Sequence, residues 1–449
     1  MNERVSMPVQ DKTKRINNFD EVELGFSKEE AIKEASRCLN CKNPMCVKGC
    51  PVGIEIPKFI EAIKNNNINL AYDIIKKSSN LPAICGRVCP QETQCEGKCI
   101  KGLKGDAIAI GALERYVADQ ARLNNINSVV KKESNGKKVA VIGSGPAGLS
   151  CAGELAKNGF DVTIYEALHK AGGVLIYGIP EFRLPKEIVE AEVKSLIDMG
   201  VKIEYDTLVG STITLDELRD MYDYIFIGTG AGLPKFMEID GIDANGVFSA
   251  NEILTRINLM GAYKELSKTP IKKNGTVYVI GGGNVAMDAA RSLKRLGMDA
   301  HIMYRRDIID MPARKKEVEH ALEEGIIFDV LENPKKIITD SDNNVIGMEV
   351  VDMEVSDIVD GRRSVVENNN FVHYKECDMV VMALGTSPNS KVFKNDLKLD
   401  DKGLIIVDDT ITSIDNVYAG GDITTGSATV ILAMEAGKKA SQKILDLNG

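Results

Sequence analysis

The chain has 449 residues, of which 44% are hydrophobic and 27% are charged, as in ordinary globular proteins. Its formal net charge of −9 argues against a nucleic-acid partner, because no basic stripe offsets the acidic total. The polar N-terminus lacks the apolar core of a signal peptide, and no apolar run approaches the ~18 residues of a membrane span. We therefore expect a cytoplasmic protein that does not cross a membrane.

Cysteines are concentrated in the first part of the chain. Eight of the ten lie between residues 38 and 99, and the first four follow the spacing C-x2-C-x4-C-x3-C-P, close to a bacterial ferredoxin run. Since the cytoplasm keeps thiols reduced, metal binding explains them better than disulfide bonds do. The two groups are Cys38, Cys41, Cys46 and Cys50, and Cys85, Cys89, Cys95 and Cys99.

Segments with helical spacing surround these cysteines. Residues 27–37 begin with Ser27, a favourable N-cap residue, and residues 56–65 and 111–123 are amphipathic. The polar residues 124–136 are typical of a linker. The sequence therefore predicts a helical metal-binding domain at the N-terminus.

A glycine-rich turn follows the first apolar strand, in the stretch KKVAVIGSGPAGLS. Its pattern is Gly143-x-Gly145-x-x-Gly148, in which the glycines permit a tight turn, a close approach to pyrophosphate, and close helix–strand packing. The pyrophosphate would then lie on the N-terminus of the helix. Glu166 ends the next strand, where a carboxylate accepts hydrogen bonds from a ribose diol.

A second glycine-rich turn has the pattern Gly281-x-Gly283-x-x-Ala286. The strand that follows it ends in positive charge, where the strand after the first turn ends in the acidic Glu166. Arg305 and Arg306 stand there in place of an acid. A guanidinium pairs with a 2′-phosphate that a carboxylate would repel, although a solvated basic pair is the alternative. We therefore expect NADP(H) on the second turn and FAD on the first.

A further flavin signal lies near the C-terminus, in NVYAGGDITTGSATVILAMEAG. Asp422 follows a strand and two glycines, where it is placed to bond a ribityl chain. A helix starting near Ser427 would direct its positive end at the flavin. For Thr429, helix packing explains the residue as well as flavin contact does.

Flavin signals at both ends of the α/β part predict that one nucleotide domain is inserted in the other. Segments 222–232 and 378–389 each contain a Gly-Thr turn and mark the two crossings. The expected fold is a helical iron–sulfur domain followed by two Rossmann-like domains, with the NADP domain inserted in the FAD domain. The expected boundaries are 1–125 for the helical domain, 126–234 and 388–449 for the FAD domain, and 235–387 for the NADP domain.

Several stretches together resemble one known family. RCLNCKNPMCVKGCPVGIEIPKFI, CGRVCPQETQCEGKC, AIGALERYVAD, VIGSGPAGLSCA, GGVLIYGIPEFRLPK, GGGNVAMDAAR, YRRD and AGGD are similar to the small (beta) subunit of glutamate synthase and its relatives. These relatives include the N-terminal half of dihydropyrimidine dehydrogenase. They also include the large NADP-binding subunit of NADH-dependent reduced ferredoxin:NADP oxidoreductase, which the chain resembles most in compactness and in its opening residues.

This resemblance implies two [4Fe-4S] clusters with interleaved ligands. One cluster would be held by Cys38, Cys41, Cys46 and Cys99. The other would be held by Cys50, Cys89, Cys95 and Glu114, the last from the motif GALERY. An ordinary exposed helix glutamate is the alternative for Glu114, in which case Cys85 completes the second cluster. Zinc is the alternative metal, but structural zinc sites usually pair two C-x2-4-C knuckles, and only Cys38–Cys41 has the short C-x2-C form.

The matching motifs also assign nucleotide-binding residues other than the glycines and Ala286 of the two patterns. These are Pro146, Ala147, Gly173 and Asn284. The position of Arg183 in YGIPEFRLPK suggests contact with the flavin or tuning of it. A disulfide reductase would place a C-x-x-C beside the flavin, whereas the C-x-x-C of this chain is in the first cysteine group.

The expected activity follows from these cofactors. Hydride transfer between nicotinamide and flavin needs stacking rather than a dedicated acid or base. We expect hydride exchange between NADP(H) and FAD, with single electrons passing through the clusters to a partner, as in electron-bifurcating ferredoxin:NADP oxidoreductase. The partner would be a smaller FAD/iron–sulfur subunit, with ferredoxin as a further candidate. The alternatives are the small subunit of NADPH-dependent glutamate synthase beside its large subunit, a sulfide dehydrogenase-type subunit, and a non-catalytic iron–sulfur scaffold.

Overall fold

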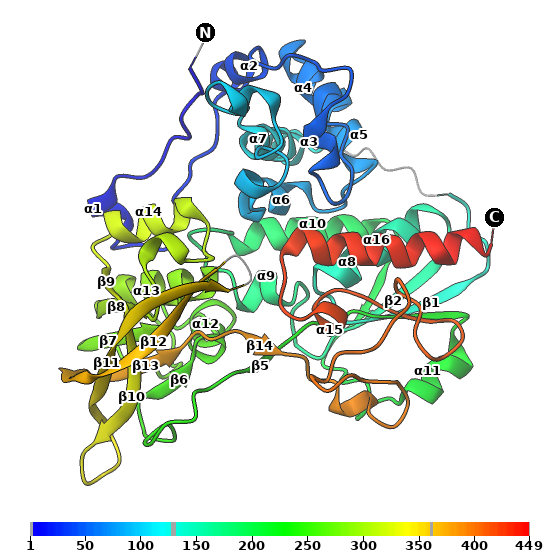
Figure 1. Cartoon of the computed structure of the whole chain (residues 1–449). Helices are drawn as coiled ribbons and strands as arrows, with labels where there is room; N and C mark the ends of the chain where they lie inside the picture. Colours follow the sequence, from blue (N-terminus) through cyan, green and yellow to red (C-terminus); the bar gives the residue numbers. More distant parts are fainter. Residues whose placement is uncertain (1–2, 127–131, 360–361, 449) are drawn as a thin grey trace.

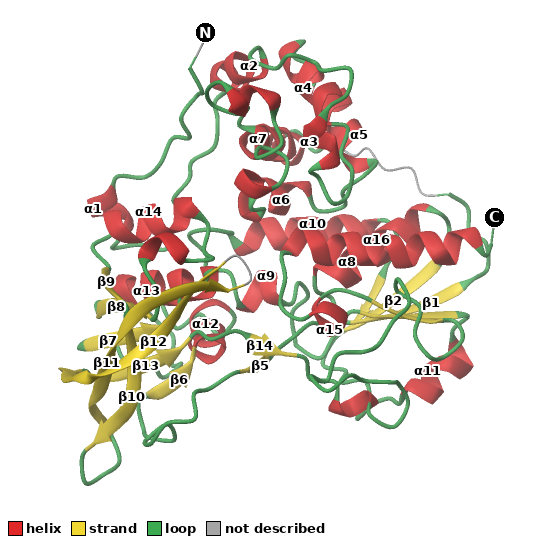
Figure 2. Ribbon diagram, viewed as in Figure 1, coloured by secondary structure: helices red, strands yellow, loops and turns green. Residues whose placement is uncertain are grey.

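The computed structural model describes residues 3–126, 132–359 and 362–448. Helices form the first part of the chain, and two parallel sheets with their covering helices form the rest (Figures 1 and 2). The helices of the N-terminal module are α1 (Lys12–Arg15), α2 (Lys28–Ala35), α3 (Met45–Lys48), α4 (Ile56–Lys64), α5 (Ile68–Lys76), α6 (Pro82–Val88) and α7 (Ile110–Leu123), with short 3-10 turns at Gln91–Thr93 and Ile100–Leu103.

The helices expected in this module are present. The Ser27 side chain accepts a hydrogen bond from the backbone of Glu30, whose carboxylate accepts one from the backbone of Ser27, so α2 begins with a capping box. Part of the expected linker, residues 127–131, lies outside the described residues.

The first sheet has the strand order β15-β4-β1-β2-β3, and all its pairs are parallel. Its last strand, β15, comes from the C-terminal part of the chain, far from the other four. The strands are β1 (Lys138–Ile142), β2 (Asp161–Tyr165), β3 (Lys202–Glu204), β4 (Tyr224–Ile227) and β15 (Val417–Ala419). The accompanying helices are α8 (Pro146–Lys157), α9 (Val174–Tyr177), α10 (Lys186–Asp198), α11 (Leu215–Met221), α15 (Asp422–Thr425) and α16 (Val430–Asp446).

The second sheet lies in the chain between β4 and β15 and has the order β6-β13-β7-β8-β9. Its strands are β6 (Val247–Ser249), β7 (Thr276–Ile280), β8 (Asp299–Tyr304), β9 (Ile327–Val330) and β13 (Met379–Met382), with helices α12 (Ala250–Asn258), α13 (Asn284–Arg295) and α14 (Lys315–Glu323) and the 3-10 turn Ile308–Asp310. An antiparallel sheet of β10 (Glu332–Thr339), β11 (Val345–Val359) and β12 (Arg362–Glu376) packs beside it.

The chain crosses between the two parallel sheets at a short antiparallel ribbon. Its strands are β5 (Leu233–Pro234) and β14 (Thr386–Ser387). The predicted fold class, with one nucleotide-binding unit inserted in the other, is therefore confirmed. The boundaries proposed above at single residues stay predictions.

One hydrophobic core joins the helical module to the first sheet. Ile84 of α6, Leu149 of α8 and Met434 of α16 belong to the same buried cluster. In Figure 1, α8, α10 and α16 lie between the helical module and the first sheet. Because burial of this apolar surface is the main source of stability, we expect the module and the first sheet to form one rigid unit.

The N-terminal segment runs from the helical module to the second sheet and back, as the blue trace in Figure 1 shows. Arg4 pairs with Glu96 in the module (Nη2–Oε2 2.7 Å). Further along, the buried Arg15 pairs with Glu324 at the end of α14 (Nε–Oε1 2.9 Å). The Val22 amide then donates to the carbonyl of Phe182 (2.9 Å), beside the first sheet. Residues 4–22 thus contact all three parts of the fold.

None of the helices in the described part of the chain combines the length and apolarity that crossing a membrane requires.

Candidate functional site

The first glycine turn joins β1 to α8 and leaves open space for a ligand. Gly143 has φ +95°, and a Cβ there would lie 2.7 Å from the Gly228 carbonyl oxygen. A Cβ on Gly148 would lie 1.9 Å from the carbonyl oxygen of Gly143, so the helix packs directly on the turn. A Cβ on Gly145, by contrast, would meet nothing within 4 Å. The turn therefore has the shape that close approach of a pyrophosphate needs.

Helix α8 presents uncapped backbone amides to this open space. Gly145 is its N-cap residue, Pro146 occupies the first turn, and no side chain caps it. The first amides of a helix and its dipole attract anions. Gly173 closes over the same place, because its Cβ would lie 3.0 Å from the Gly145 Cα.

Glu166 lies at the end of β2, as the sequence predicts, and is buried. Its Oε2 accepts a hydrogen bond from the Ser144 amide (3.0 Å) and another from the Ser144 hydroxyl, while Oε1 accepts from the Leu168 amide (2.8 Å). These bonds fix the carboxylate beside the glycine turn and leave acceptor capacity for a diol.

The C-terminal segment reaches the same turn. A Cβ on Gly437 of α16 would lie 2.1 Å from the Ala147 carbonyl oxygen, and one on Gly421 would lie 3.1 Å from the Ala147 Cβ. Asp422 follows directly, and burial raises its pKa to about 6. The structure thus brings Asp422 close to the turn of β1 and α8, although nearly 280 residues separate them in the sequence.

Helix α16 begins at Val430, with Thr429 as its N-cap, so the start expected near Ser427 was three residues early. The reason is that Asp422–Thr425 forms a separate short helix, α15, which ends at Gly426 with φ +79°. The Thr429 hydroxyl accepts a hydrogen bond from the Leu432 amide (3.4 Å). Capping therefore accounts for Thr429 without a ligand.

Tyr177 is a neighbour of this site that the sequence did not reveal. Burial raises its pKa to about 12, and the carboxylates of Asp422 and Glu166 add to the increase. Tyr177 ends α9, and the only local signal for it was the surrounding motif GGVLIYG.

The second glycine turn joins β7 to α13 in the same way. Gly281 has φ +141°, and a Cβ there would lie 2.5 Å from the Ala383 carbonyl oxygen, whereas a Cβ on Gly283 would meet nothing within 4 Å. Ala286 is completely buried in α13. Asn284 opens that helix, and its Oδ1 accepts a hydrogen bond from the Arg314 amide (2.9 Å).

The two arginines after β8 differ in their surroundings. Arg305 is exposed, and within the described ranges it forms no ion pair. Arg306 is half-buried and donates from Nε to the carbonyl of Arg363 (2.8 Å), which lies on β12. Arg363 in turn pairs with Asp310 (Nη2–Oδ2 2.8 Å). The cations expected for a 2′-phosphate are thus at the strand end, and β12 orients one of them.

Four cysteines, which we call the first set, surround one cavity at the surface of the helical module. Apolar side chains such as Ile56, Ile60 and Ile110 line it as well. Burial and the neighbouring Cys99 raise the pKa of Cys46 to about 11. The four cysteines of this cavity are Cys38, Cys41, Cys46 and Cys99.

The second set, Cys50, Cys89, Cys95 and Glu114, lies deeper in the helical module than the first set does. Burial raises the pKa of Cys50 to about 11, and Glu114 adds to the increase. A hydrogen bond with Cys85 lowers the pKa of Cys89, but burial, Glu114 and Cys50 outweigh it and raise that pKa. Burial, Glu114 and Cys50 raise the pKa of Cys95 as well. All ten cysteines are free thiols. The structure therefore brings Cys50, Cys89, Cys95 and Glu114 together, and separates Cys50 from the other three cysteines of its sequence group.

Glu114 and Cys85 are the two candidates for the last ligand of the second set. Glu114 is only 6% exposed, so it is not an ordinary surface glutamate, and its Oε1 has no hydrogen-bond partner among the described residues. Burial raises its pKa to about 8. The Cys85 Sγ lies 3.4 Å from the Met434 Sδ and 4.0 Å from the Ser79 Oγ. A buried carboxylate oxygen without a partner is costly and fits a metal ligand.

Comparison with known proteins agrees with a division into a cysteine-bearing helical module and a nucleotide-binding part. Residues 15–126 match the family model described as dihydropyrimidine dehydrogenase domain II, 4Fe-4S cluster, and residues 137–437 match the pyridine nucleotide-disulphide oxidoreductase model. The glutamate synthase [NADPH] small chain of Escherichia coli is 34% identical, over 99% of this chain and 97% of that one. The chain belongs to the glutamate synthase small-chain family. It is thus an oxidoreductase with a flavin- and NAD(P)-binding part and a 4Fe-4S part.

Two further comparisons place this family member. The beta subunit of an NADP(+)-dependent formate dehydrogenase from Moorella thermoacetica is 36% identical, over 89% of this chain and 59% of that one. The structure of Mycobacterium tuberculosis FprA in complex with NADPH matches with a TM-score of 0.58 at 19% identity, over 70% of this chain and 85% of that one. The second match supports the fold alone. The narrower resemblance to the ferredoxin:NADP oxidoreductase subunit stays a prediction.

Arg183 of this family member lies between the two nucleotide-binding units. Its Nη1 is 2.6 Å from the Asp288 Oδ2, and its Nε is 3.2 Å from the Glu317 Oε1. All three side chains are buried. The guanidinium therefore joins the loop after α9 to helices α13 and α14, and a contact with the flavin stays a prediction.

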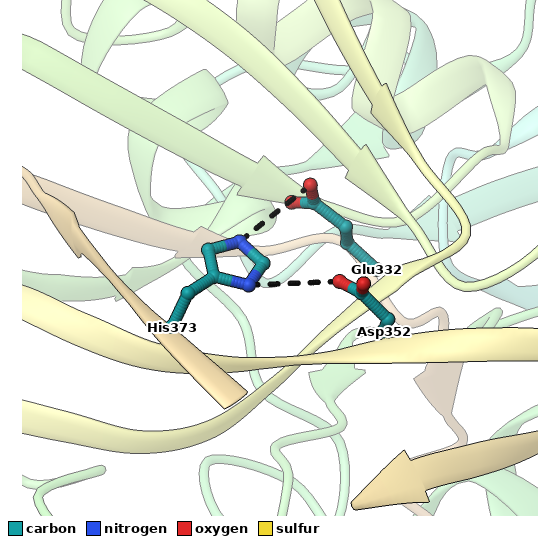
Figure 3. A group of neighbouring side chains, drawn as sticks. All are labelled: Glu332, Asp352 and His373. Atoms are coloured by element: carbon teal, nitrogen blue, oxygen red, sulfur yellow. Dashed lines mark ion pairs between the residues drawn. The ribbon is translucent and has the colours of Figure 1, made fainter. Parts of the chain in front are cut away.

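Another group of potential ligands lies on the antiparallel sheet (Figure 3). His373 is placed between Glu332 and Asp352, which are opposite each other on β10 and β11 (Nε2–Oε1 3.7 Å, Nδ1–Oδ1 3.5 Å). However, the Lys375 ammonium already lies 2.8 Å from the Glu332 Oε2. A divalent cation would be repelled by Lys375, so we assign this cluster to strand pairing.

Proposed function

We propose that the chain is an NADP(H)-linked electron-transfer subunit that binds FAD on the first turn, NADP(H) on the second, and two [4Fe-4S] clusters in the helical module. The observation that carries this proposal is the shared hydrophobic core. Helix α16 packs on the first glycine turn through Gly437 and against α6 through Met434 and Cys85, and Cys89 of the second set caps the end of α6. One helix therefore joins the flavin-type site to the segment that carries the second set.

The residues of the first turn would bind FAD by complementary charge. The amides of α8 would bind the pyrophosphate, and Glu166 would accept from the ribose. Asp422 would bond the ribityl chain. The positive end of α16 would stabilise negative charge on the isoalloxazine.

The residues of the second turn would select NADP(H). The amides of α13 would bind the pyrophosphate, and Arg305 and Arg306 would pair with the 2′-phosphate. The chemistry that the bound cofactors supply is hydride exchange between nicotinamide and flavin, and single-electron transfer through iron–sulfur clusters. The nucleotide-binding part of this disulphide oxidoreductase family member contains only Cys151 and Cys377, which are buried and far apart in the sequence, so it carries no C-x-x-C pair. Electrons would therefore leave by the clusters.

The surface around the first cysteine set suggests where a partner docks. Leu39, Met45, Ile100 and Leu103 are exposed large apolar side chains on the loops that carry these cysteines. The segments 39–50 and 97–106 contain five lysines and one acidic residue, in a chain whose net charge is −9. We define Lys42, Lys48, Lys98, Lys101 and Lys104 as the lysine rim. Exposed apolar side chains and lysines on the same loops fit an acidic one-electron carrier or subunit.

We favour a bifurcating system, in which a smaller FAD/iron–sulfur subunit and ferredoxin are the partners. The small subunit of NADPH-dependent glutamate synthase is the second candidate, because that relative matches over nearly its full length. Anaerobic purification from the native cell distinguishes the two. A smaller co-purifying flavoprotein supports bifurcation, whereas a much larger FMN protein supports glutamate synthase. A preparation that binds neither flavin nor iron contradicts both.

A further inference from the structure

One arginine connects the second nucleotide turn to the cysteine-bearing loop without passing through the first sheet. The Arg314 amide donates to the Asn284 Oδ1 at the start of α13 (2.9 Å). Its guanidinium donates to the Gln91 Oε1 (2.9 Å) and the Arg87 carbonyl (3.2 Å), and pairs with the Glu92 Oε1 (3.3 Å). The backbone of Arg314 thus belongs to one site and its side chain to the other.

Gln91 is the residue that holds the cysteine loop together. Its amide donates to the Cys89 carbonyl (2.9 Å), and its own carbonyl accepts from the Glu96 amide (3.0 Å), directly after Cys95. Its side-chain Nε2 donates to the Cys85 carbonyl (3.2 Å). Through Oε1, Arg314 therefore contacts the residue that sets the spacing between Cys89 and Cys95.

The other end of the connection is the loop between β8 and α14. This loop starts with Arg305 and Arg306 and ends at Arg314. The Ala313 amide donates to the carbonyl of Gly282 (3.2 Å), which fastens the loop to the glycine turn. A nucleotide that binds the turn and both arginines would therefore touch the loop at each end.

We propose that Arg314 is a positioning residue that couples nucleotide binding on the second turn to the cluster held by Cys50, Cys89, Cys95 and Glu114. This inference rests on the proposed function. A guanidinium beside the loop stabilises an added electron on the cluster. Nucleotide phosphates on the second turn would attract the Arg314 guanidinium and weaken its stabilisation of the added electron. The midpoint potential of this cluster should therefore fall when nucleotide binds. By linkage, the reduced protein binds nucleotide more weakly, which favours release of spent NADP(+).

The test uses the anaerobic holoprotein and 2′-phospho-ADP-ribose, a probe with the phosphates of NADP but no redox chemistry. EPR-monitored titration gives the midpoint potential of each cluster with and without the probe, and Glu114→Ala identifies the signal of the second cluster. We expect the probe to lower the midpoint potential of the second cluster and to leave that of the first cluster unchanged. We also expect its dissociation constant to rise about fivefold on reduction with dithionite.

Three variants decide whether Arg314 carries the coupling. Arg314→Gln should bind the probe but lose both the shift in midpoint potential and the rise in dissociation constant on reduction. Arg314→Lys, which keeps the charge without the guanidinium fork, should lose part of both. Lys315→Gln removes a neighbouring exposed charge and should behave like the parent. An unshifted potential in the parent, or a full shift in Arg314→Gln, would overturn the inference. An equal loss in Lys315→Gln would also overturn it, in favour of a general charge effect. Missing iron–sulfur signals would instead contradict the proposed function.

Discussion

At the residue scale, Glu114 and Cys85 compete for one ligand position, and their surroundings differ in kind. The Oε1 of Glu114 is buried and has no hydrogen-bond partner among the described residues, whereas the Cys85 thiol contacts Met434 and Ser79 and forms a hydrogen bond with Cys89. A buried polar atom that is left unsatisfied costs about 1–3 kcal/mol, which a bound iron would offset. Glu114 is therefore the better candidate.

Removing each candidate in turn tests this assignment. Glu114→Ala should lower the iron content from about eight toward about four atoms per chain and remove one EPR signal, since one [4Fe-4S] cluster loses a ligand. The matched variant Cys85→Ala should keep both clusters. Retention of both clusters in Glu114→Ala, together with loss of one in Cys85→Ala, reverses the assignment.

The arginines after β8 make a second prediction at this scale. Arg305→Ala and Arg306→Ala should each raise the dissociation constant of NADPH about tenfold to a hundredfold, because a charge-assisted pair with the 2′-phosphate contributes roughly 1.5–3 kcal/mol. NADH lacks that phosphate, so its binding is the internal control and should change little. Parallel weakening of both nucleotides would mean that the arginines support the fold rather than the choice of cofactor.

At the scale of elements, α13, α14 and α1 are held together by one buried carboxylate. Glu324, at the end of α14, is completely buried and pairs with Arg15, Arg291 and Arg295 at 2.9, 2.8 and 2.7 Å. The guanidinium groups of Arg291 and Arg295 lie over the ring of Phe182. Burial alone would raise the pKa of Glu324, but the arginines lower it to about 2. The N-terminal segment is therefore fastened to α14 by a charge cluster with little access to water.

Neutralising Glu324 should release that segment. Glu324→Gln leaves the buried Arg295 guanidinium without a carboxylate, and it removes one of two carboxylate partners from Arg15 and from Arg291. It should therefore destabilise this contact by about 3–5 kcal/mol. Limited trypsin digestion should then cut at Lys12, Lys14 or Arg15, and the melting temperature should fall. Glu319→Gln, on an exposed position of the same helix, is the control. Resistance to trypsin equal to that of the parent would show that the segment is held elsewhere.

The same cluster predicts a pH dependence. Because the folded pKa of Glu324 is lowered from 4.5 to about 2, its stabilising contribution is complete above about pH 4.5 and is lost as the pH falls toward 2. Trypsin cannot be used at such pH, so pepsin digestion is the measurement. Cleavage near residues 10–20, divided by the cleavage rate of an unfolded substrate at the same pH, should increase over this interval in the parent. In Glu324→Gln this ratio should already be high at pH 4.5 and change less.

At the scale of the whole molecule, the parts that the sequence predicts well are those whose signals are local. The glycine turns, the Ser27 cap and the cysteine spacing are each contained in a few neighbouring residues. Helix α16 begins later than the expected position near Ser427, because α15 is a local irregularity that no sequence pattern indicates. The contacts of Arg314 with Gln91 and of Arg15 with Glu324 could not be predicted, since they join segments more than 200 residues apart through packing alone.

The lysine rim is the feature at this scale that concerns partners. Reversing two of its charges, in Lys101→Glu/Lys104→Glu, should slow electron transfer to an acidic carrier about tenfold or more at low salt, and the difference should shrink as salt is added. Flavin reduction by NADPH should not change. Lys394→Glu/Lys398→Glu, between β14 and β15, makes the same change in charge elsewhere and should leave the rate near that of the parent. Equal slowing by both pairs would show that net charge, not this surface, controls the encounter.

The central claim is that NADP(H) on the second turn exchanges a hydride with FAD on the first. The most direct measurement is an anaerobic titration of the holoprotein with NADPH, and separately with NADH, followed by the visible absorption of the flavin. The account predicts that near-stoichiometric NADPH bleaches the flavin band, whereas NADH requires a far larger excess. Equal bleaching by NADH would contradict the role of Arg305 and Arg306, and a flavin that neither nucleotide bleaches would contradict the account as a whole.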